Sequence, residues 1–248
     1  MNRAKYAAAR LAARSLGALQ RHDEPAHGTR VLMYHDVNDT GTRDDIYSLP
    51  VGQFAEGVAA LVKWARQYGH SFVPLTATPQ PGIAVTFDDG YRSTLTLAAP
   101  ILAEHSISFS VFVTKSFVDS NSKYLTTTDL QTLASLPGAV LGTHGVSHSQ
   151  FAELDEKALR EELSSSLDWL QQTIGAPVTS LSYPHGSHTQ RIGEIAHEYG
   201  YTTAACSSRG TFTDATQSMR IPRIDIWSHD AGTSTIEKTR GDWDRLLP

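Results

Sequence analysis

The sequence is poor in cysteine, in basic charge and in long apolar runs. Its 248 residues include a single cysteine, Cys206, which excludes an intrachain disulfide framework. The formal net charge of −5 leaves no basic surplus of the kind found in nucleic-acid-binding domains. No run approaches the roughly 18 consecutive apolar residues of a membrane-spanning helix. The sequence therefore predicts no nucleic-acid partner and no membrane span.

The N-terminal segment is rich in alanine but is interrupted by Arg3, Lys5, Arg10 and Arg14. Its alanine-rich composition predicts a helical extension over residues 1–28, ahead of one domain over residues 29–248. The segment lacks the uncharged apolar core of a secretory signal. A cytoplasmic location is expected, and a mature chain whose signal has been removed is the alternative. This helix could contact an anionic membrane surface, but its alanine-rich face favours packing against protein or exposure to solvent.

Segments of β character alternate with segments of helical periodicity. Apolar residues recur at helical spacing in Val51–Tyr68, Leu154–Ile174 and Arg191–Tyr199. This alternation predicts a largely parallel sheet with crossover helices, and seven strands suit an α/β barrel. Residues 36–48 are polar and predict a loop near the site, and the tail after Ser228 is expected to be loosely held. The predicted strands are Val31–Tyr34, Ile83–Phe87, Ser108–Val113, Val140–Gly142, Thr179–Tyr183, Thr202–Cys206 and Ile221–Asp225.

The most informative motif is the apolar strand Ile83–Phe87, which ends in two adjacent carboxylates, Asp88 and Asp89. Adjacent Asp residues repel each other and cannot both be buried without compensation. A cation would resolve this conflict. Further along the chain, the spacing of His144 and His148 predicts two ligands on one face of a helical turn. Asp with two His suits one divalent transition metal, with zinc as the first expectation and cobalt, nickel or iron as alternatives.

These motifs resemble those of the polysaccharide deacetylases with the NodB homology domain (carbohydrate esterase family 4). The resemblance rests on the TFDDG run at residues 86–90 and the HxxxH run at residues 144–148, and it extends from about residue 29 to residue 228. It implies a distorted (β/α)7 barrel of the NodB type. One departure is Gly145, because many members have Ser or Thr after the first His.

The resemblance also implies roles for individual residues. It assigns Asp88 as the general base, and the metal ligands would be Asp89, His144 and His148. The activity implied is hydrolysis of an N-acetyl group on an amino sugar of a surface polysaccharide or its precursor. Alternatives are a deacylase of a small amide or O-acetyl ester, and an inactive glycan-binding module. The intact motif argues against the inactive module, and the sequence defines no oligomeric state.

Two histidines are candidates for the general acid. In the common order of the family the acid lies in a Leu-x-His strand near the C-terminus, whereas the late candidate here, His229, has no such context. His35 follows the first predicted strand, as in circularly permuted members such as the poly-N-acetylglucosamine deacetylases. We therefore expect His35 to be the acid, oriented by Asp225, Asp36 or Asp230. The alternative is a structural His at a strand end.

The SYPHG run at residues 182–186 stands where the family usually has Arg-x-Pro-Tyr-Gly, so the Arg that orients the catalytic Asp is absent. Arg223, in the last predicted strand, is expected to reach this carboxylate instead, and an ion pair elsewhere is the alternative. The backbone amide of Tyr183 is a candidate oxyanion donor. For Trp227, a core position and contact with substrate are equally expected. For His185, a structural role and contact with substrate are equally expected. The residues expected to contact substrate are Tyr91, Tyr183, His185 and Trp227.

Overall fold

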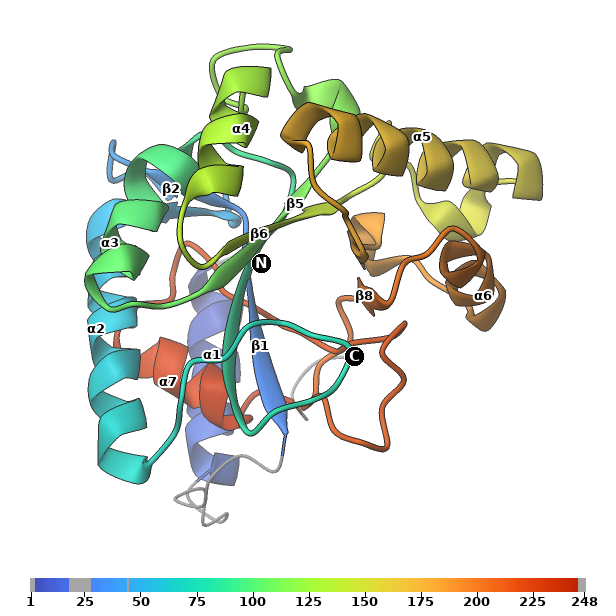
Figure 1. The fold of residues 1–248 in the computed structure, drawn as a ribbon. Coiled ribbons are helices and arrows are strands. Elements are labelled where there is room, and N and C mark those ends of the chain that lie inside the picture. The colour runs from blue at the N-terminus through green and yellow to red at the C-terminus, as the bar shows by residue number, and fades with distance from the viewer. Residues whose placement is uncertain (1–2, 18–27, 44, 245–248) are drawn as a thin grey trace.

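The computed structural model describes residues 3–17, 28–43 and 45–244 (Figure 1). The main strands are β1 (Thr29–Tyr34), β4 (Gly82–Phe87), β5 (Phe109–Val113), β6 (Ala139–Thr143), β7 (Ser180–Ser182), β8 (Thr203–Ala205) and β9 (Ile224–Asp225). They form one seven-stranded parallel sheet in the order β8-β7-β6-β5-β4-β1-β9. Each of the predicted strands overlaps one of these strands, which confirms the predicted α/β architecture.

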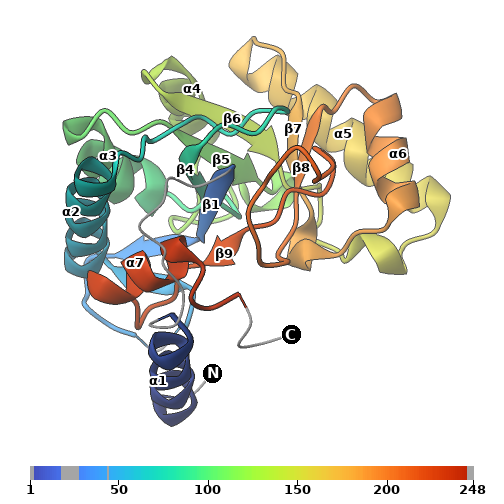
Figure 2. The same ribbon diagram turned by 90° about the horizontal axis from the view of Figure 1, so that it is seen from below.

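The sheet is curled into a barrel, and the chain segment of residues 221–225 lies between β8 and β1. Ala205 of β8 forms a parallel bridge with Ile221, shortly before β9, and β9 pairs with β1 on the other side. Cys206 N donates to Ile221 O at 2.9 Å and extends this link. Figure 2 shows the strands at the centre of the molecule with the helices around them. This arrangement is the distorted seven-stranded barrel that the sequence predicted.

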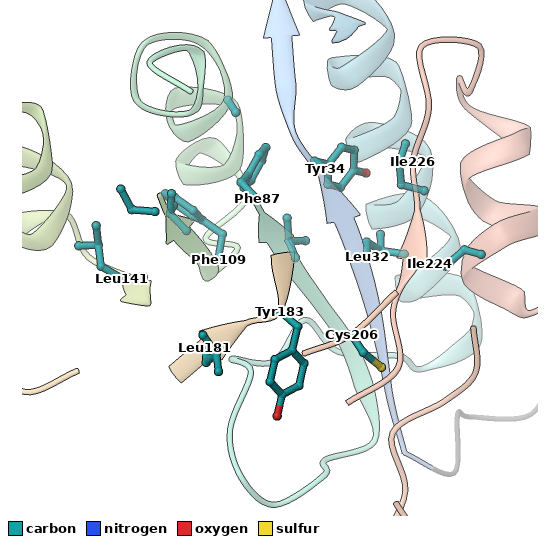
Figure 3. Close-up of a cluster of buried hydrophobic side chains, with 14 of the residues drawn as sticks. Leu32, Tyr34, Phe87, Phe109, Leu141, Leu181, Tyr183, Cys206, Ile224 and Ile226 are labelled. Carbon is teal, nitrogen blue, oxygen red and sulfur yellow. The ribbon is translucent and has the colours of Figure 1, made fainter. Parts of the chain in front are cut away.

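The strands β1 and β4 are covered on both faces. Every residue of β1 and β4 is buried, as is typical of parallel strands between a barrel interior and surrounding helices. Side chains from neighbouring strands, among them Leu32, Phe87 and Phe109, pack in one cluster (Figure 3). This core holds the carboxyl ends of the strands in place.

The helices are α1 (Arg3–Gly17), α2 (Val51–Tyr68), α3 (Ala99–Glu104), α4 (Thr127–Ser135), α5 (Glu156–Ile174), α6 (Gln190–Glu198) and α7 (Thr233–Arg240). Short helical turns are η1 (Thr94–Ala98), η2 (Lys115–Phe117), η3 (Phe151–Glu153) and η4 (Pro184–Gly186). α2 coincides with its prediction. α5 begins after Asp155 because that side chain caps it by accepting a hydrogen bond from Ala158 N at 2.8 Å. No helix in the described ranges is both long and apolar enough to cross a membrane.

The segment predicted as a loop over residues 36–48 contains strands at both ends. β2 (Asp36–Asn38) pairs in parallel with β3 (Ser48–Pro50), outside the main sheet. The Asp36 carboxylate accepts hydrogen bonds from Ser48 Oγ at 2.6 Å and from Ser93 Oγ at 2.7 Å. The loop prediction was wrong at its ends because polar side chains there bond to one another, which a search for apolar periodicity does not detect.

Residues 229–244, the described part of the tail after Ser228, are packed, so the expectation of a loosely held tail was wrong for them. The buried Lys238 and Asp230 side chains form an ion pair with an N–O distance of 2.6 Å. Tyr6 of α1 donates its hydroxyl to the same carboxylate at 2.5 Å, and Lys238 Nζ lies 3.7 Å from the centre of the Trp227 ring. Polar composition misled the prediction because these groups satisfy each other inside the protein.

α1 accounts for residues 3–17 of the predicted N-terminal extension and packs against α7. Residues 1–2 and 18–27 of that extension, and residues 245–248 of the predicted domain, lie outside the described residues.

Candidate metal and catalytic site

The predicted site residues gather at the carboxyl ends of the strands. Asp88 and Asp89 follow β4 directly, His144 follows β6 and His35 follows β1. Because the last residues of β1 and β4 are paired, His35 and Asp88 leave neighbouring strands at the same level. Residues far apart in the sequence are therefore brought to one end of the barrel, where α/β barrels carry their chemistry.

Asp89, His144 and His148 converge on one point. Asp89 Oδ1 lies 3.1 Å from His148 Nε2 and 3.5 Å from His144 Nε2, and one ligand atom from each residue lies within 4.8 Å of the others. Asp89 Oδ1 is buried, yet none of the described residues donates a hydrogen bond of acceptable geometry to it. A buried carboxylate oxygen without a donor, beside two imidazole nitrogens, fits the coordination of a divalent cation.

His144 is fixed in one orientation by the backbone. Its Nδ1 donates to Ser182 O at 2.8 Å, which leaves the lone pair on Nε2 available toward Asp89. Burial lowers the pKa of His144, although the nearby Asp88 and Asp89 charges oppose this effect. A lowered pKa favours the neutral imidazole, which is the form that binds metal.

The two histidines lie on a loop and not on a helical turn. After β6, the backbone turns tightly at Gly145, with φ of 75°, and His148 also adopts a left-handed φ of 64°. The two rings nevertheless lie 5.0 Å apart. The prediction of a helical turn was wrong because a tight turn at glycine brings these side chains together as well as a helix does.

Arg223 reaches the Asp88 carboxylate from just before β9. Its Nη1 donates to Asp88 Oδ1 at 2.8 Å and its Nη2 donates to Oδ2 at 2.7 Å, which is the bidentate geometry of a strong ion pair. Both side chains are buried. Burial alone would raise the pKa of Asp88, but the charge and hydrogen bonds of Arg223, together with the charges of His144 and His35, outweigh it and hold the pKa well below its usual range. Asp88 is therefore ionised at neutral pH.

Ser182 bridges the Asp88 carboxylate and the Arg223 guanidinium. Its hydroxyl donates to Asp88 Oδ2 at 3.0 Å and accepts from Arg223 Nη2 at 2.7 Å. Arg223 Nε also donates to Cys206 O at 3.1 Å, so the guanidinium is held on two sides. Arg223 thus contacts the carboxylate that the sequence analysis named, and within the described ranges it forms no ion pair elsewhere.

His35 lies close to the carboxylates of the site. The charge of the His35 imidazolium acts to lower the pKa values of Asp88, Asp89 and Asp225. Its Nδ1 is buried and has no hydrogen-bond partner in the part of the chain that the structure describes.

The three acidic residues proposed to orient His35 lie in different environments. Asp36 is engaged by two serine hydroxyls, and Asp230 is engaged by Tyr6 and Lys238. Asp225 is the remaining candidate, and burial raises its pKa although His35 opposes this shift. The competing acid candidate, His229, packs its ring 5.5 Å from the Tyr6 ring of α1.

Of the predicted substrate contacts, His185 borders the metal-ligand cluster. It is exposed, and its ring lies 4.4 Å from the ring of His148. Tyr91 is 8% exposed because its ring stacks on that of Tyr124 at 5.1 Å. Trp227 is a core residue, covered by Lys238 and by other aromatic rings. The structure therefore gives Trp227 the core position, which is one of the two alternatives that the sequence left open.

Tyr183 cannot contact substrate in this structure. Its side chain is fully buried, its hydroxyl donates to Met219 O at 2.9 Å, and Figure 3 places it within the apolar cluster. Its backbone amide donates to Ala205 O at 3.0 Å. The predicted oxyanion donor is therefore already engaged in holding β7 against β8.

Tyr47 is a site residue that the sequence analysis missed. Its ring lies 4.6 Å from the ring of His35, and 43% of the residue is exposed. Burial raises the pKa of Tyr47, and the charges of Asp225 and Asp89 contribute to the shift. Its position in the polar segment before β3 was the available signal. A partly exposed ring beside the predicted acid is suited to contact a sugar.

Comparison with known proteins agrees with the fold and with the motifs. The sequence profile of the family described as polysaccharide deacetylase matches residues 76–204. This range includes Asp88, Asp89, His144 and His148 but excludes His35.

Individual relatives are distant in sequence. YxkH of Bacillus subtilis (strain 168), a polysaccharide deacetylase by name, is 22% identical over 190 residues, which cover 73% of this chain and 64% of the relative. Chitin deacetylase 1 of Cryptococcus neoformans is 24% identical over 163 residues, which cover 66% of this chain and 33% of the relative. The chain thus spans less than two thirds of the length of either relative.

A solved structure shares the fold. The Streptococcus pyogenes deacetylase PplD, determined in complex with acetate, superposes with a TM-score of 0.73 at 17% identity, covering 90% of this chain and 100% of that chain. The profile match extends over about half of this chain and includes the paired aspartates and both histidines. The chain belongs to the polysaccharide deacetylase family.

Proposed function

We propose that this chain is a metal-dependent hydrolase that removes the N-acetyl group from an amino sugar of a surface polysaccharide or its precursor. The observation that carries the proposal is the cluster of Asp89, His144 and His148 beside the buried Asp88–Arg223 pair. It combines a ligand set for a cation with an ionised carboxylate that is not part of that set. The cytoplasmic location stays a prediction.

Asp89, His144 and His148 would hold the divalent cation, for which zinc is the first candidate. When bound, such a cation supplies a Lewis acid that polarises the acetyl carbonyl and lowers the pKa of water. Asp88 would accept the proton of the attacking water on its carboxylate. Arg223 keeps this carboxylate ionised and fixes its direction, although a lowered pKa also makes it a weaker base.

His35 would donate a proton to the leaving nitrogen. His35 directly follows β1 and Asp88 directly follows β4, and the last residues of these two strands are paired. The proposed acid and base therefore follow neighbouring strands. Asp225 lies near the His35 imidazole. Tyr47 and His185 would contact the sugar at the edge of the site, because both are exposed and each adjoins a functional residue.

The proposal predicts that acetate release from N-acetylglucosamine oligomers depends on about one bound divalent ion per chain. Protein stripped with a chelator should be inactive, and added Zn²⁺ or Co²⁺ should restore activity. Elemental analysis and acetate release, measured on the same samples, check this. His148→Ala should lose metal affinity, and His105→Ala on the exposed surface should not.

The same assay separates the competing functions. Release from O-acetyl esters or small amides, without release from acetamido sugars, would favour the broader deacylase activity. Metal binding without hydrolysis of any of these substrates would favour a glycan-binding module. Failure to bind any divalent ion would contradict the proposal.

A second prediction separates the two acid candidates. His35→Ala should lower the rate of acetate release by about 10²-fold because the leaving nitrogen loses its proton donor. His229→Ala should leave the rate near that of the wild type, since His229 packs against Tyr6 of α1. Rates at saturating substrate, with metal content verified for each variant, provide the measurement. Equal losses in both variants, or a larger loss for His229→Ala, would overturn the assignment.

A further inference from the structure

The loop that carries the two histidines is held by a side chain from a helix. Glu162 of α5 accepts hydrogen bonds on Oε2 from Val146 N at 2.6 Å and from Ser147 N at 3.1 Å. The Ser147 hydroxyl donates to the other carboxylate oxygen, Oε1. One carboxylate therefore binds three successive donors between His144 and His148.

The opposite side of the loop is bonded as well. Lys115 N donates to Gly145 O at 3.1 Å, and Ser116 N donates to Val146 O at 2.9 Å. These two bonds come from the backbone of η2 and do not depend on side-chain identity. Glu162 supplies the side-chain part of this clamp.

Gly145 provides the space that the carboxylate needs. A Cβ atom at this position would lie 2.9 Å from Glu162 Oε2 and 3.2 Å from the Phe151 ring. Gly145 also has φ of 75°, a conformation that disfavours other residues. Gly145 is a residue at which this chain departs from the family that it resembles. The Glu162 carboxylate occupies the space that a side chain at this position would need.

α5 is a rigid support for Glu162. The helix is anchored in the core by its buried residues Leu159, Leu163, Leu167 and Leu170. Glu162 directly precedes Leu163, so its backbone cannot shift without disturbing the core. A well-packed helix thus holds this carboxylate against a loop in which Gly145 and His148 have left-handed φ angles.

We propose that Glu162 is a positioning residue for metal binding, which sets the separation and direction of His144 and His148 by anchoring the loop between them. This inference rests on the proposed metal site. Substitution of groups that orient metal ligands typically weakens metal affinity by about 10- to 100-fold. Because Ser147 is exposed, water can replace the lost hydrogen bonds, so the loss is expected in metal affinity more than in folding.

The test measures metal affinity in chelator-stripped protein with Glu162→Gln, Glu162→Ala and the control Glu161→Gln. Glu161 is the preceding residue on α5, is exposed and lies outside this contact. Competition between protein and chelator for Zn²⁺ should show weakening of about tenfold for Glu162→Gln and up to about 100-fold for Glu162→Ala, with Glu161→Gln unchanged. The visible absorption of bound Co²⁺ should also change in the Glu162 variants, because it reports ligand geometry.

Two further readouts separate positioning from a general loss of structure. The melting temperature of the stripped protein should be nearly the same for Glu162→Gln and the wild type. Amide exchange at Val146 and Ser147 should accelerate in that variant even without metal. Wild-type Zn²⁺ affinity and Co²⁺ absorption in Glu162→Ala would overturn this inference alone, whereas absence of metal binding by the wild type would overturn the proposed function and this inference together.

Discussion

Asp88→Asn is expected to lower the rate of acetate release by up to about 10⁴-fold while leaving the metal bound. Asn is similar in size to Asp, but its amide cannot accept the proton of the attacking water. Asp88 is bonded to Arg223 and lies outside the set formed by Asp89, His144 and His148, so its substitution spares the ligands. Single-turnover rates and elemental analysis on the same preparation check both parts of the expectation.

The neighbouring Asp89→Asn is the matched control for this variant. It makes the same chemical change one residue away, but it removes a metal ligand, so metal affinity should fall together with activity. If Asp88→Asn loses its metal, or if it retains near-normal turnover, the roles of the two aspartates have been assigned the wrong way round.

Arg223→Met is expected to reduce the free energy of unfolding by about 3–5 kcal/mol, because it leaves the buried Asp88 charge without its partner. The Arg223 side chain is 0% exposed and that of Asp88 is 3% exposed, so water cannot replace the guanidinium. Adding Asp88→Asn to Arg223→Met should restore part of the stability, since the uncompensated charge is then gone. Urea unfolding of the two single variants and the double variant provides the measurement.

Arg191→Met is the control for this second experiment. Arg191 also pairs with a carboxylate, that of Glu156, but both side chains are more than half exposed. Water screens exposed pairs of this kind, so the loss should be small. A loss of similar size in Arg191→Met and Arg223→Met would show that the Asp88–Arg223 pair is not the buried support described here.

Much of the scaffold could be predicted because its signals are local. The apolar run before Asp88 predicts a strand, and β4 ends at Phe87 as expected. The periodicity of Val51–Tyr68 predicts α2 with its observed bounds, and Gly175, with φ of 68°, ends α5. In each case the pattern and the stop signal lie within a few residues of the element that they define.

Two of the incorrect predictions, those for the C-terminal tail and for Tyr183, share a different cause. The tail after Ser228 is polar in composition, yet Lys238 and Asp230 are buried because they pair with each other and with Tyr6 of α1. Tyr183 stands in a motif near the site, yet its amide and hydroxyl bond to Ala205 and to Met219. Such outcomes depend on partners that are remote in the sequence.

The sequence by itself determined the alternation of strands and helices, the aspartate pair at the end of a strand and the histidine pair that resembles a family of deacetylases. Only the tertiary structure decided that Arg223, 135 positions after Asp88, is the group that pairs with it, and that Glu162 binds the loop of His148. The physical reason is range. Periodicity and capping act over a few residues, whereas a buried ion pair or a carboxylate clamp forms only where packing brings distant groups within hydrogen-bond distance.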